Sequence, residues 1–255
     1  MLRYEVARPR ATITIDYPER RNPLANADMA EMGRLIARAA ADSDVAVIVV
    51  TGAGDKAFSA GGDLSGGFVD APLVDHDERA ALAGLLRAMR SAGKPIVARV
   101  NGHALAGGFG LAAACDIVIA VDDATFGAPE IKVGLWPMMV TAVLQRVMPH
   151  KAALELMMTG RRITAEEALR LGVVSRVTSR AELDAAVDLV VNTLAAMSPA
   201  VLRMGRDAFF AVEDLDFDAA LMHLHGGLTA VVSTEDAAEG VGAFLDKRRP
   251  QWKGR

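Results

Sequence analysis

Two glycine-rich stretches, residues 58–67 (FSAGGDLSGG) and residues 104–110 (ALAGGFG), could do chemistry with their main chains rather than with side chains. Glycine lets a backbone N–H approach a ligand without obstruction by a Cβ atom. The second stretch opens a short predicted helix, and an N–H at a helix start favours a developing negative charge. If the two stretches converge, they form a two-donor oxyanion hole. Taken separately, either could be no more than a turn.

Residues 51–57 (TGAGDKA) superficially match a dinucleotide-binding signature, because they follow a predicted buried strand. A nucleotide-binding fold would continue into an amphipathic helix and would carry an acidic residue about 20 positions further on. Instead, the glycine-rich stretch 58–67 follows directly. The sequence therefore argues against dinucleotide binding.

The elements that must position these loops alternate between strand and helix patterns. Residues 12–16 alternate as a half-buried strand does, and residues 45–50 are uniformly apolar, as in a strand covered on both faces. The further predicted elements are helices at about 26–41, 78–91 and 108–114 and strands at 96–100 and 116–120. This alternation implies parallel strand pairing with right-handed crossovers, so the predicted fold class is α/β.

The chain changes character in its last third. From about residue 180 onward the pattern is helical almost throughout, and it breaks at Ser198-Pro199. We therefore expect two parts: an α/β core over residues 1–197 that holds the ligand site, and a helical region over residues 198–255.

Composition excludes several classes of protein. Among the 255 residues there is one cysteine, Cys115, so neither an internal disulfide nor a Cys-rich metal site is expected. A net charge of −4 provides no basic field for nucleic acid. The longest unmixed apolar run, residues 45–50, is far shorter than the roughly 20 residues of a membrane helix. The first residues lack the order of a secretory signal, so we expect a cytoplasmic protein without a nucleic-acid or membrane partner.

Several motifs, in order along the chain, resemble the crotonase (enoyl-CoA hydratase/isomerase) superfamily. FSAGGDL (58–64) resembles the first oxyanion segment of that family, NGHALAGG (101–108) the second, and FGAPE (126–130) part of the third. Further matches lie at residues 114–117, 133–137, 159–174 and 244–250. Each match is modest alone, but their order from about residue 12 to residue 252 makes the set specific.

The resemblance implies a spiral of ββα units and a C-terminal helical region that forms trimers, often paired into hexamers. It implies a coenzyme A thioester as the substrate and no metal or redox cofactor. Carried over by position, the thioester carbonyl would lie between the N–H groups of Gly62 and Gly107, with Glu130 as the acid/base. Each preorganised donor to such an oxygen is worth about 3–4 kcal/mol in the transition state.

One position departs from the family pattern in a way that bears on the reaction. Family hydratases carry a second glutamate three residues after the second oxyanion glycine, and this chain has Gly110 there. One placed acid or base contributes about 10²–10⁴-fold. Its loss should weaken hydration but leave enolate stabilisation intact. Moving a double bond needs only one base, so the sequence favours isomerisation with Glu130 as that base.

Other activities stay open at this point. Hydration could use Glu130 alone, or with a carboxylate of the following loop: Asp70, Asp75, Asp77 or Glu78. Another thioester reaction, such as hydrolysis or decarboxylation, would also fit. The last alternative is an acyl-CoA-binding protein without turnover.

The remaining candidate residues concern substrate binding. Arg21 and Lys56 match positions where relatives contact the phosphates, although each could equally be a solvated charge. Phe244 and Lys247 resemble a pair that reaches the nucleotide end, often from a neighbouring subunit. Two more candidates are Ala60, in the first oxyanion segment, and Trp136, at the acyl pocket or in the core.

His103 lies beside the second oxyanion loop and invites a catalytic role. Relatives place varied residues at this position, so we interpret His103 as a structural histidine.

Overall fold

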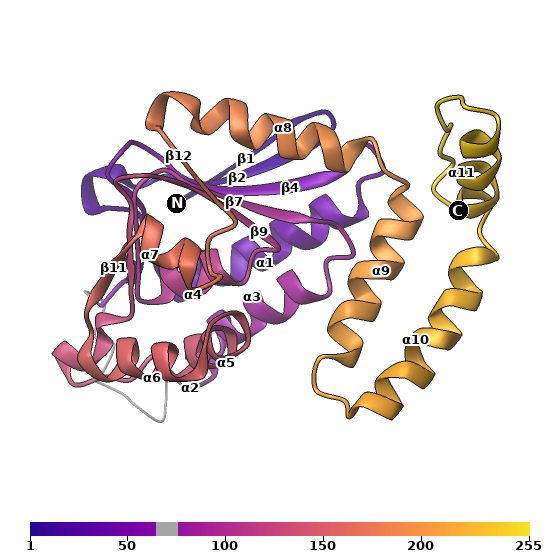
Figure 1. Ribbon diagram of the computed structural model, residues 1–255. Coiled ribbons are helices and arrows are strands. Elements are labelled where there is room, and N and C mark those ends of the chain that lie inside the picture. Colours follow the sequence, from indigo (N-terminus) through magenta and orange to yellow (C-terminus); the bar gives the residue numbers. More distant parts are fainter. Residues whose placement is uncertain (65–75) are drawn as a thin grey trace.

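The computed structural model describes residues 1–64 and 76–255, and its centre is a six-stranded sheet (Figure 1). The strand order is β1-β2-β4-β7-β9-β12. The bounds are β1 Leu2–Ala7, β2 Arg10–Ile15, β4 Val47–Gly52, β7 Ile96–Val100, β9 Ile117–Val121 and β12 Arg176–Thr178. From β2 to β12 every neighbouring pair is parallel, which confirms the predicted pairing. Only β1 is antiparallel to its neighbour β2, and the sequence reading missed that strand.

Helices cover both faces of this sheet. α1 (Asn26–Ala41) and α3 (Ala81–Arg90) contact each other on one face, and α8 (Leu183–Ala195) lies on the other (Figure 1). α1 has the predicted bounds, and the apolar stripe that we expected to be buried is buried: Met29, Met32, Leu35, Ile36 and Ala39. We expected one helix at 78–91, but the structure has two there. α2 (His76–Arg79) ends before α3 begins.

A smaller sheet carries the two glycine loops. Its order is β11-β10-β8-β5, and β8 is parallel to both β5 and β10. The bounds are β5 Ala57–Ser59, β8 His103–Leu105, β10 Thr125–Gly127 and β11 Arg162–Thr164. A further pair joins β3 (Pro23–Leu24) to β6 (Gly61–Gly62). Alternation over two or three residues is too short to recognise in a sequence, so none of these strands was predicted.

Short helices fill the space between the sheets. α4 (Gly107–Ala113) is buried over most of its length, and its Phe109 ring lies 5.8 Å from that of Phe126 in β10. The other elements of this part are η1 Pro18–Arg20, η2 Pro129–Val133, α5 Met138–Val147, α6 His150–Thr159, α7 Ala165–Arg170 and η3 Arg180–Glu182. Because α4 is apolar throughout, it can lie in the core between two layers.

The C-terminal helices extend away from the sheets (Figure 1). They are α9 Pro199–Val212, α10 Phe217–Val232 and α11 Glu235–Leu245. The chain bends by 102° between the helical span Arg180–Ala195 and α9. This bend coincides with the predicted break at Ser198-Pro199, while the division into two domains stays a prediction. Within the described ranges, no single helix is long and apolar enough to cross a membrane, and only this bent pair meets the length and composition test.

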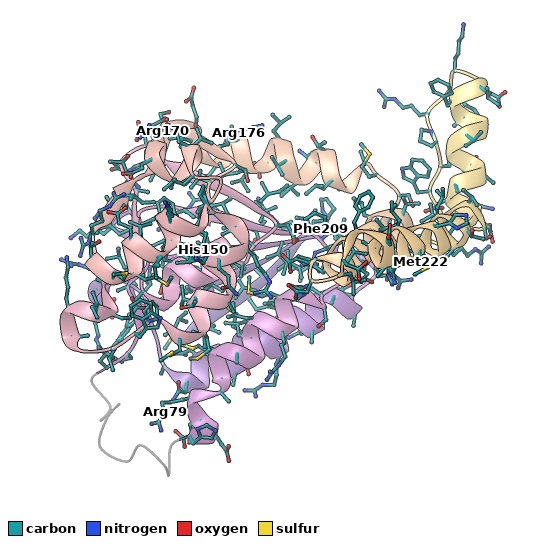
Figure 2. The ribbon with its side chains drawn as sticks, turned by 60° about the horizontal axis from the view of Figure 1, so that its bottom comes forward. Arg79, His150, Arg170, Arg176, Phe209 and Met222 are labelled. Atoms are coloured by element: carbon teal, nitrogen blue, oxygen red, sulfur yellow. The ribbon has the colours of Figure 1, made fainter. Side chains whose placement is uncertain are left out.

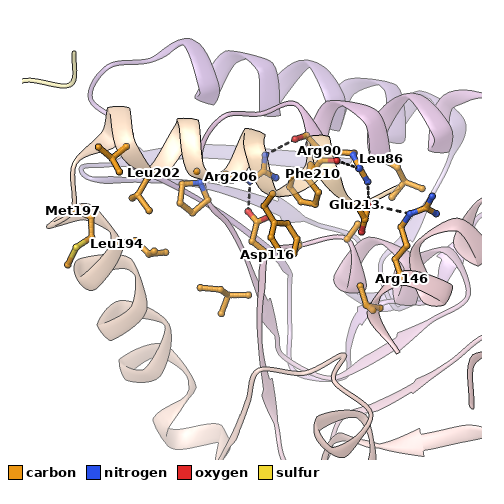
Figure 3. Close-up of a pocket in the computed structure, with 18 of the residues that line it drawn as sticks. Leu86, Arg90, Asp116, Arg146, Leu194, Met197, Leu202, Arg206, Phe210 and Glu213 are labelled. Atoms are coloured by element: carbon orange, nitrogen blue, oxygen red, sulfur yellow. Dashed lines mark hydrogen bonds and ion pairs between the residues drawn. The ribbon is translucent and has the colours of Figure 1, made fainter. Parts of the chain in front are cut away.

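A network of polar contacts fixes α9 against the core (Figure 3). Arg206 donates to the carbonyls of Met89 (2.6 Å) and Arg90 (2.7 Å) at the end of α3, and to the Asp116 carboxylate (2.9 Å). The Phe210 ring lies between the Arg90 and Arg206 guanidinium groups, each 4.8 Å from its centroid. Arg206 thus satisfies the free carbonyls that any helix leaves at its C-terminus.

Candidate active site

Three chain segments meet at one edge of the smaller sheet. Strands β5, β8 and β10 are parallel neighbours, so their carboxyl ends lie at the same edge. These ends lead into β6, α4 and η2, which carry Gly62, Gly107 and Glu130, respectively. The Ala106 N–H donates to the Gly127 carbonyl (2.8 Å), which ties the second segment to the third. Topology therefore brings all three predicted residues to one region.

The first two segments approach each other closely. A methyl group on Gly61 would lie 2.6 Å from the Cβ of Ala106 and 3.0 Å from the amide nitrogen of Gly107. A methyl group on Gly107 would lie 3.6 Å from the amide nitrogen of Gly62. Gly61 also has φ +96°, a conformation that side chains rarely adopt. The two glycine loops converge, as the oxyanion-hole hypothesis requires.

The surrounding hydrogen bonds leave the two predicted donor amides available. The Asp63 N–H donates to the Leu24 carbonyl (3.0 Å), so the β3–β6 pairing uses the amide that follows Gly62. Gly107 is the first residue of α4, where a helical N–H has no partner inside its own helix. Both amides could therefore donate to a bound oxygen, and that role stays a prediction.

Among the described residues, Glu130 brings a carboxylate to this region. It is half-buried in η2, and its Oε2 atom is buried without a hydrogen-bond partner among the described residues. Burial raises the pKa of Glu130, against a smaller lowering by a backbone hydrogen bond. The Leu135 N–H donates to the Glu130 carbonyl (3.0 Å) and fixes the turn. A buried, unpartnered carboxylate of this kind can accept a proton and return it.

The position of the absent second glutamate is filled by an apolar side chain. Gly110 is buried in α4, and a methyl group there would lie 2.7 Å from Cγ2 of Val140 in α5. Of the loop carboxylates named as alternatives, Asp77 and Glu78 are exposed on α2. Asp70 and Asp75 lie outside the described residues.

Arg21 and Lys56 line one polar cavity of about 480 Å³. Its other lining residues are Asp55, Gly102, His103, Asp123, Arg162 and Arg180. Arg180 is paired with Asp123 (2.8 Å), whereas no ion pair is found for Arg21, Lys56 or Arg162 in the part of the chain that the structure describes. Sequence reasoning missed Arg162, because only the pairing of β11 with β10 brings it near the first segment. An excess of cationic side chains around a cavity suits phosphate groups.

His103 has a structural partner and faces this same cavity. Its Nδ1 lies 2.9 Å from the Thr125 hydroxyl oxygen on the neighbouring strand. Burial lowers the pKa of His103, and the charges of Arg162 and Arg21 lower it further. The hydrogen bond fits the interpretation of His103 as a structural residue.

The other substrate-binding candidates lie in different places. The Ala60 N–H donates to the Arg21 carbonyl (2.9 Å), so the first oxyanion segment is joined to the Arg21 turn. Trp136 is half-buried and packs against the hydrophobic core, which fits the alternative that it is a core residue. Phe244 is 81% exposed on α11, and Lys247 follows it with φ 55°. α11 stands apart from both sheets (Figure 1), so one chain does not bring this pair to Arg21 and Lys56.

Metal and cofactor binding were predicted to be absent. Over residues 1–64 and 76–255, no group of three or more His, Cys, Asp or Glu side chains is arranged to hold a metal ion. The expectation that no cofactor is needed stays a prediction.

A larger cavity of about 1230 Å³ lies elsewhere and is lined by residues of α3, α5, α9 and α11. Figure 3 shows the side of it where α9 lies near α3 and α5. Its lining is mainly apolar, with charged groups such as Arg90, Asp116 and Glu213. None of Gly62, Gly107 and Glu130 lines it. This cavity is therefore separate from the three converging segments.

Comparisons with known proteins agree with this arrangement. The family model described as "Enoyl-CoA hydratase/isomerase" matches residues 9–255. Carnitinyl-CoA dehydratase of Escherichia coli (strain K12) is 36% identical over 249 residues, which cover 95% of this chain and 94% of that protein. The homologues are thus enzymes.

Solved structures show the same fold. The enoyl-CoA hydratase of Mycobacterium smegmatis superposes with a TM-score of 0.94 at 32% identity, and covers 98% of each chain. Human enoyl Coenzyme A hydratase domain-containing protein 3 gives a TM-score of 0.94 at 30% identity, over 98% of this chain and 99% of that one. The predicted α/β, crotonase-like fold class is confirmed. The chain belongs to the enoyl-CoA hydratase/isomerase family.

Proposed function

We propose that this protein moves a double bond in an enoyl-CoA thioester, from the 3,4 to the 2,3 position. The observation that carries the proposal concerns the described residues: there Glu130 has a buried oxygen without a hydrogen-bond partner, and Val140 fills the place where a second carboxylate on α4 would start. One proton-carrying group is enough for this reaction, whereas typical hydratases of the family use two.

The proposed steps use only this chain's own groups. Glu130 takes a proton from C2 of the 3-enoyl thioester, and the C–H electron pair moves toward the thioester oxygen. The amides of Gly62 and Gly107 donate to the enolate oxygen that forms. The protonated Glu130 then returns the proton to C4 as the C2–C3 double bond forms. Burial supports both roles, because the raised pKa of Glu130 brings it closer to the working pH.

Reversible hydration is the second candidate function. The names of two relatives, carnitinyl-CoA dehydratase and enoyl-CoA hydratase, favour it. In that reaction Glu130 would take a proton from water as oxygen adds to C3, and would then deliver a proton to C2. If Glu130 acts alone it must do both, so we expect this route to be slower unless a loop carboxylate such as Asp70 or Asp75 takes part.

The same proposal assigns the phosphates of coenzyme A to the polar cavity. The cations Arg21 and Lys56 line it and have no ion-pair partner among the described residues, and the Ala60 amide links Arg21 to the oxyanion segment. Arg162 adds a third such cation.

We also propose that the protein self-associates through its C-terminal helices. α10 has no buried residue in the isolated chain, and Met222 and Leu228 are 73% and 59% exposed. Figure 2 shows Phe209 on α9 and Met222 on α10. Large apolar side chains left exposed on one helix are typical of an interface. A second copy placed there could bring its Phe244 and Lys247 to the first copy's substrate. Light scattering after Met222→Glu and Leu228→Glu, with the exposed Leu189→Glu on α8 as the matched control, tests this association.

A panel of 2-enoyl and 3-enoyl thioesters, assayed for hydration and for double-bond migration, tests the proposed reaction. We expect 3-enoyl thioesters to be converted faster than 2-enoyl thioesters are hydrated. Release of free coenzyme A would reveal hydrolysis instead. Deuterium exchange at C2 of a bound acyl-CoA would show that the protein is a catalyst. A protein that only binds acyl-CoA would give no exchange. Rapid hydration of crotonyl-CoA without migration would contradict the proposal in favour of a hydratase.

A further inference from the structure

The contact between Gly110 and Val140 leaves no space for any side chain at position 110. A methyl group on Gly110 would lie 2.7, 3.1 and 3.2 Å from Cγ2, Cγ1 and Cβ of Val140. Carbon atoms in ordinary contact are about 3.5–4.0 Å apart. Both residues are buried, and Val140 is only 2% exposed. Val140 would therefore have to move before any larger residue could occupy position 110.

Position 110 is close to the proposed chemistry. It lies three residues after Gly107 in α4, so the two residues share a helix face, one turn apart. A side chain at position 110 would start on the face that carries the donor amide. In this protein that space contains the two methyl groups of Val140, which cannot hold a water molecule by hydrogen bonds.

Val140 is held in place by the segment that also carries Glu130. The Leu135 N–H donates to the Glu130 carbonyl (3.0 Å), and the Met138 N–H donates to the Trp136 carbonyl (2.8 Å). At the start of α5, the N–H and the hydroxyl of Thr141 donate to the Pro137 carbonyl (2.8 and 2.9 Å). Valine also has few rotamers in a helix. The catalytic carboxylate and the apolar side chain are thus placed by one continuous, hydrogen-bonded segment.

We propose that Val140 is a specificity-determining residue, which keeps a second carboxylate and its water away from the Gly107 amide and so favours proton return to C4 over addition of water. This inference rests on the proposed function. It adds that the choice between the two reactions is set by the packing of α5 against α4, and not only by the identity of residue 110.

A double-mutant cycle tests the packing without an activity assay. We expect Gly110→Ala to lower Tm in the natural protein, and to lower it less, or to raise it, in the Val140→Ala background. Gly84→Ala is the matched control, because Gly84 is also helical and nothing lies within 4 Å of an added methyl group. Alanine suits a helix better than glycine, so Gly84→Ala should raise Tm by about 2–4 °C in both backgrounds. If Gly110→Ala shifts Tm equally in both backgrounds, the proposal is wrong.

Activity tests the specificity. We expect Gly110→Glu/Val140→Ala to hydrate crotonyl-CoA at least about 10-fold faster than Val140→Ala does, since one placed acid or base is worth 10²–10⁴-fold. Val140→Ala alone should already raise the ratio of hydration to isomerisation. If the double variant does not fold, an unchanged ratio in Val140→Ala overturns the proposal, and so does a folded double variant without any gain.

The outcomes separate this inference from the function on which it rests. If the natural protein moves no double bond and Glu130→Gln changes nothing, the proposed function fails, whatever the cycle shows. If migration depends on Glu130 but the cycle shows no coupling, only the role of Val140 fails.

Discussion

Asp236 and Glu130 both have buried carboxylate oxygens, but the hydrogen-bond partners of the two groups differ. Asp236, in the first turn of α11, is 1% exposed. It accepts hydrogen bonds from the Ser198 hydroxyl (2.5 Å) and from the N–H groups of Lys253 (2.6 Å) and Gly254 (3.1 Å). Burial alone would raise the pKa of Asp236, but these donors outweigh it and hold the pKa below its ordinary value.

Among the described residues, Glu130 has no such set of donors. One of its oxygens is buried without a hydrogen-bond partner in that part of the chain, and burial raises its pKa. The comparison shows that the donors around a carboxylate decide whether burial raises its pKa. The donors around Asp236 favour its anionic form and tie residues 253–254 to α11, whereas the raised pKa of Glu130 suits the proton transfer that we propose for it.

The largest effect is expected on catalysis. Glu130→Gln removes the proposed proton carrier and should lower the rate of double-bond migration by about 10²–10⁴-fold. Initial rates on a 3-enoyl thioester measure it, with Glu31→Gln, which lies on α1 and outside the candidate site, as the control. Normal activity in Glu130→Gln would mean that another group moves the proton.

The second effect concerns stability. Asp236→Ala leaves one hydroxyl and two N–H groups without their charged acceptor and should lower the free energy of unfolding by about 3 kcal/mol. Ser198→Ala, which also loses the helix cap that accepts from Val201 N–H (3.1 Å), should cost about 1 kcal/mol. Urea denaturation measures both. If the two variants lose equally little, the Asp236 contacts are not an anchor.

The third effect is on the pH dependence of activity. Since Glu130 must be ionised to take the C2 proton, kcat/KM should fall tenfold per pH unit below its pKa. That acid limb should lie above the ordinary glutamate pKa of about 4.3, as the burial of Glu130 requires. A pH–rate profile with its limb at the ordinary value would show that the carboxylate is solvated in the working enzyme.

The smallest effect is on the pH dependence of stability, which should have opposite signs for Glu130 and Asp236. A raised pKa means that ionised Glu130 destabilises the fold once the pH exceeds that pKa, so Glu130→Gln should be more stable than the natural protein at neutral pH and lose this advantage in acid. A lowered pKa means that Asp236 stabilises the fold above its unfolded pKa. Asp236→Asn should therefore be weakest, relative to the natural protein, at neutral pH. Urea titrations at several pH values measure the free energy of unfolding of both variants. If the difference from the natural protein changes with pH in the same direction for both, the two carboxylates do not differ as we expect.

Local patterns predicted most of the core of the fold. β4 was predicted correctly because a strand covered on both faces is uniformly apolar. α1 was predicted correctly because an amphipathic helix has apolar residues at helical spacing. β1 and the strands of the smaller sheet were missed, and those of the smaller sheet exist only through pairing with distant segments. The helix at 78–91 was misread because nothing in its apolar pattern marks the turn at Ala80.

The candidate site divides in the same way. The sequence by itself determined which groups are available: two glycine loops, one glutamate after Pro129, and no side chain at position 110. Only the tertiary structure decided that Val140 fills the space beside Gly110, that Arg162 joins Arg21 and Lys56, and that Asp236 is buried among three donors. The physical reason is that spacing along the chain fixes which face a residue shares, whereas contacts between segments far apart in sequence depend on how whole elements pack.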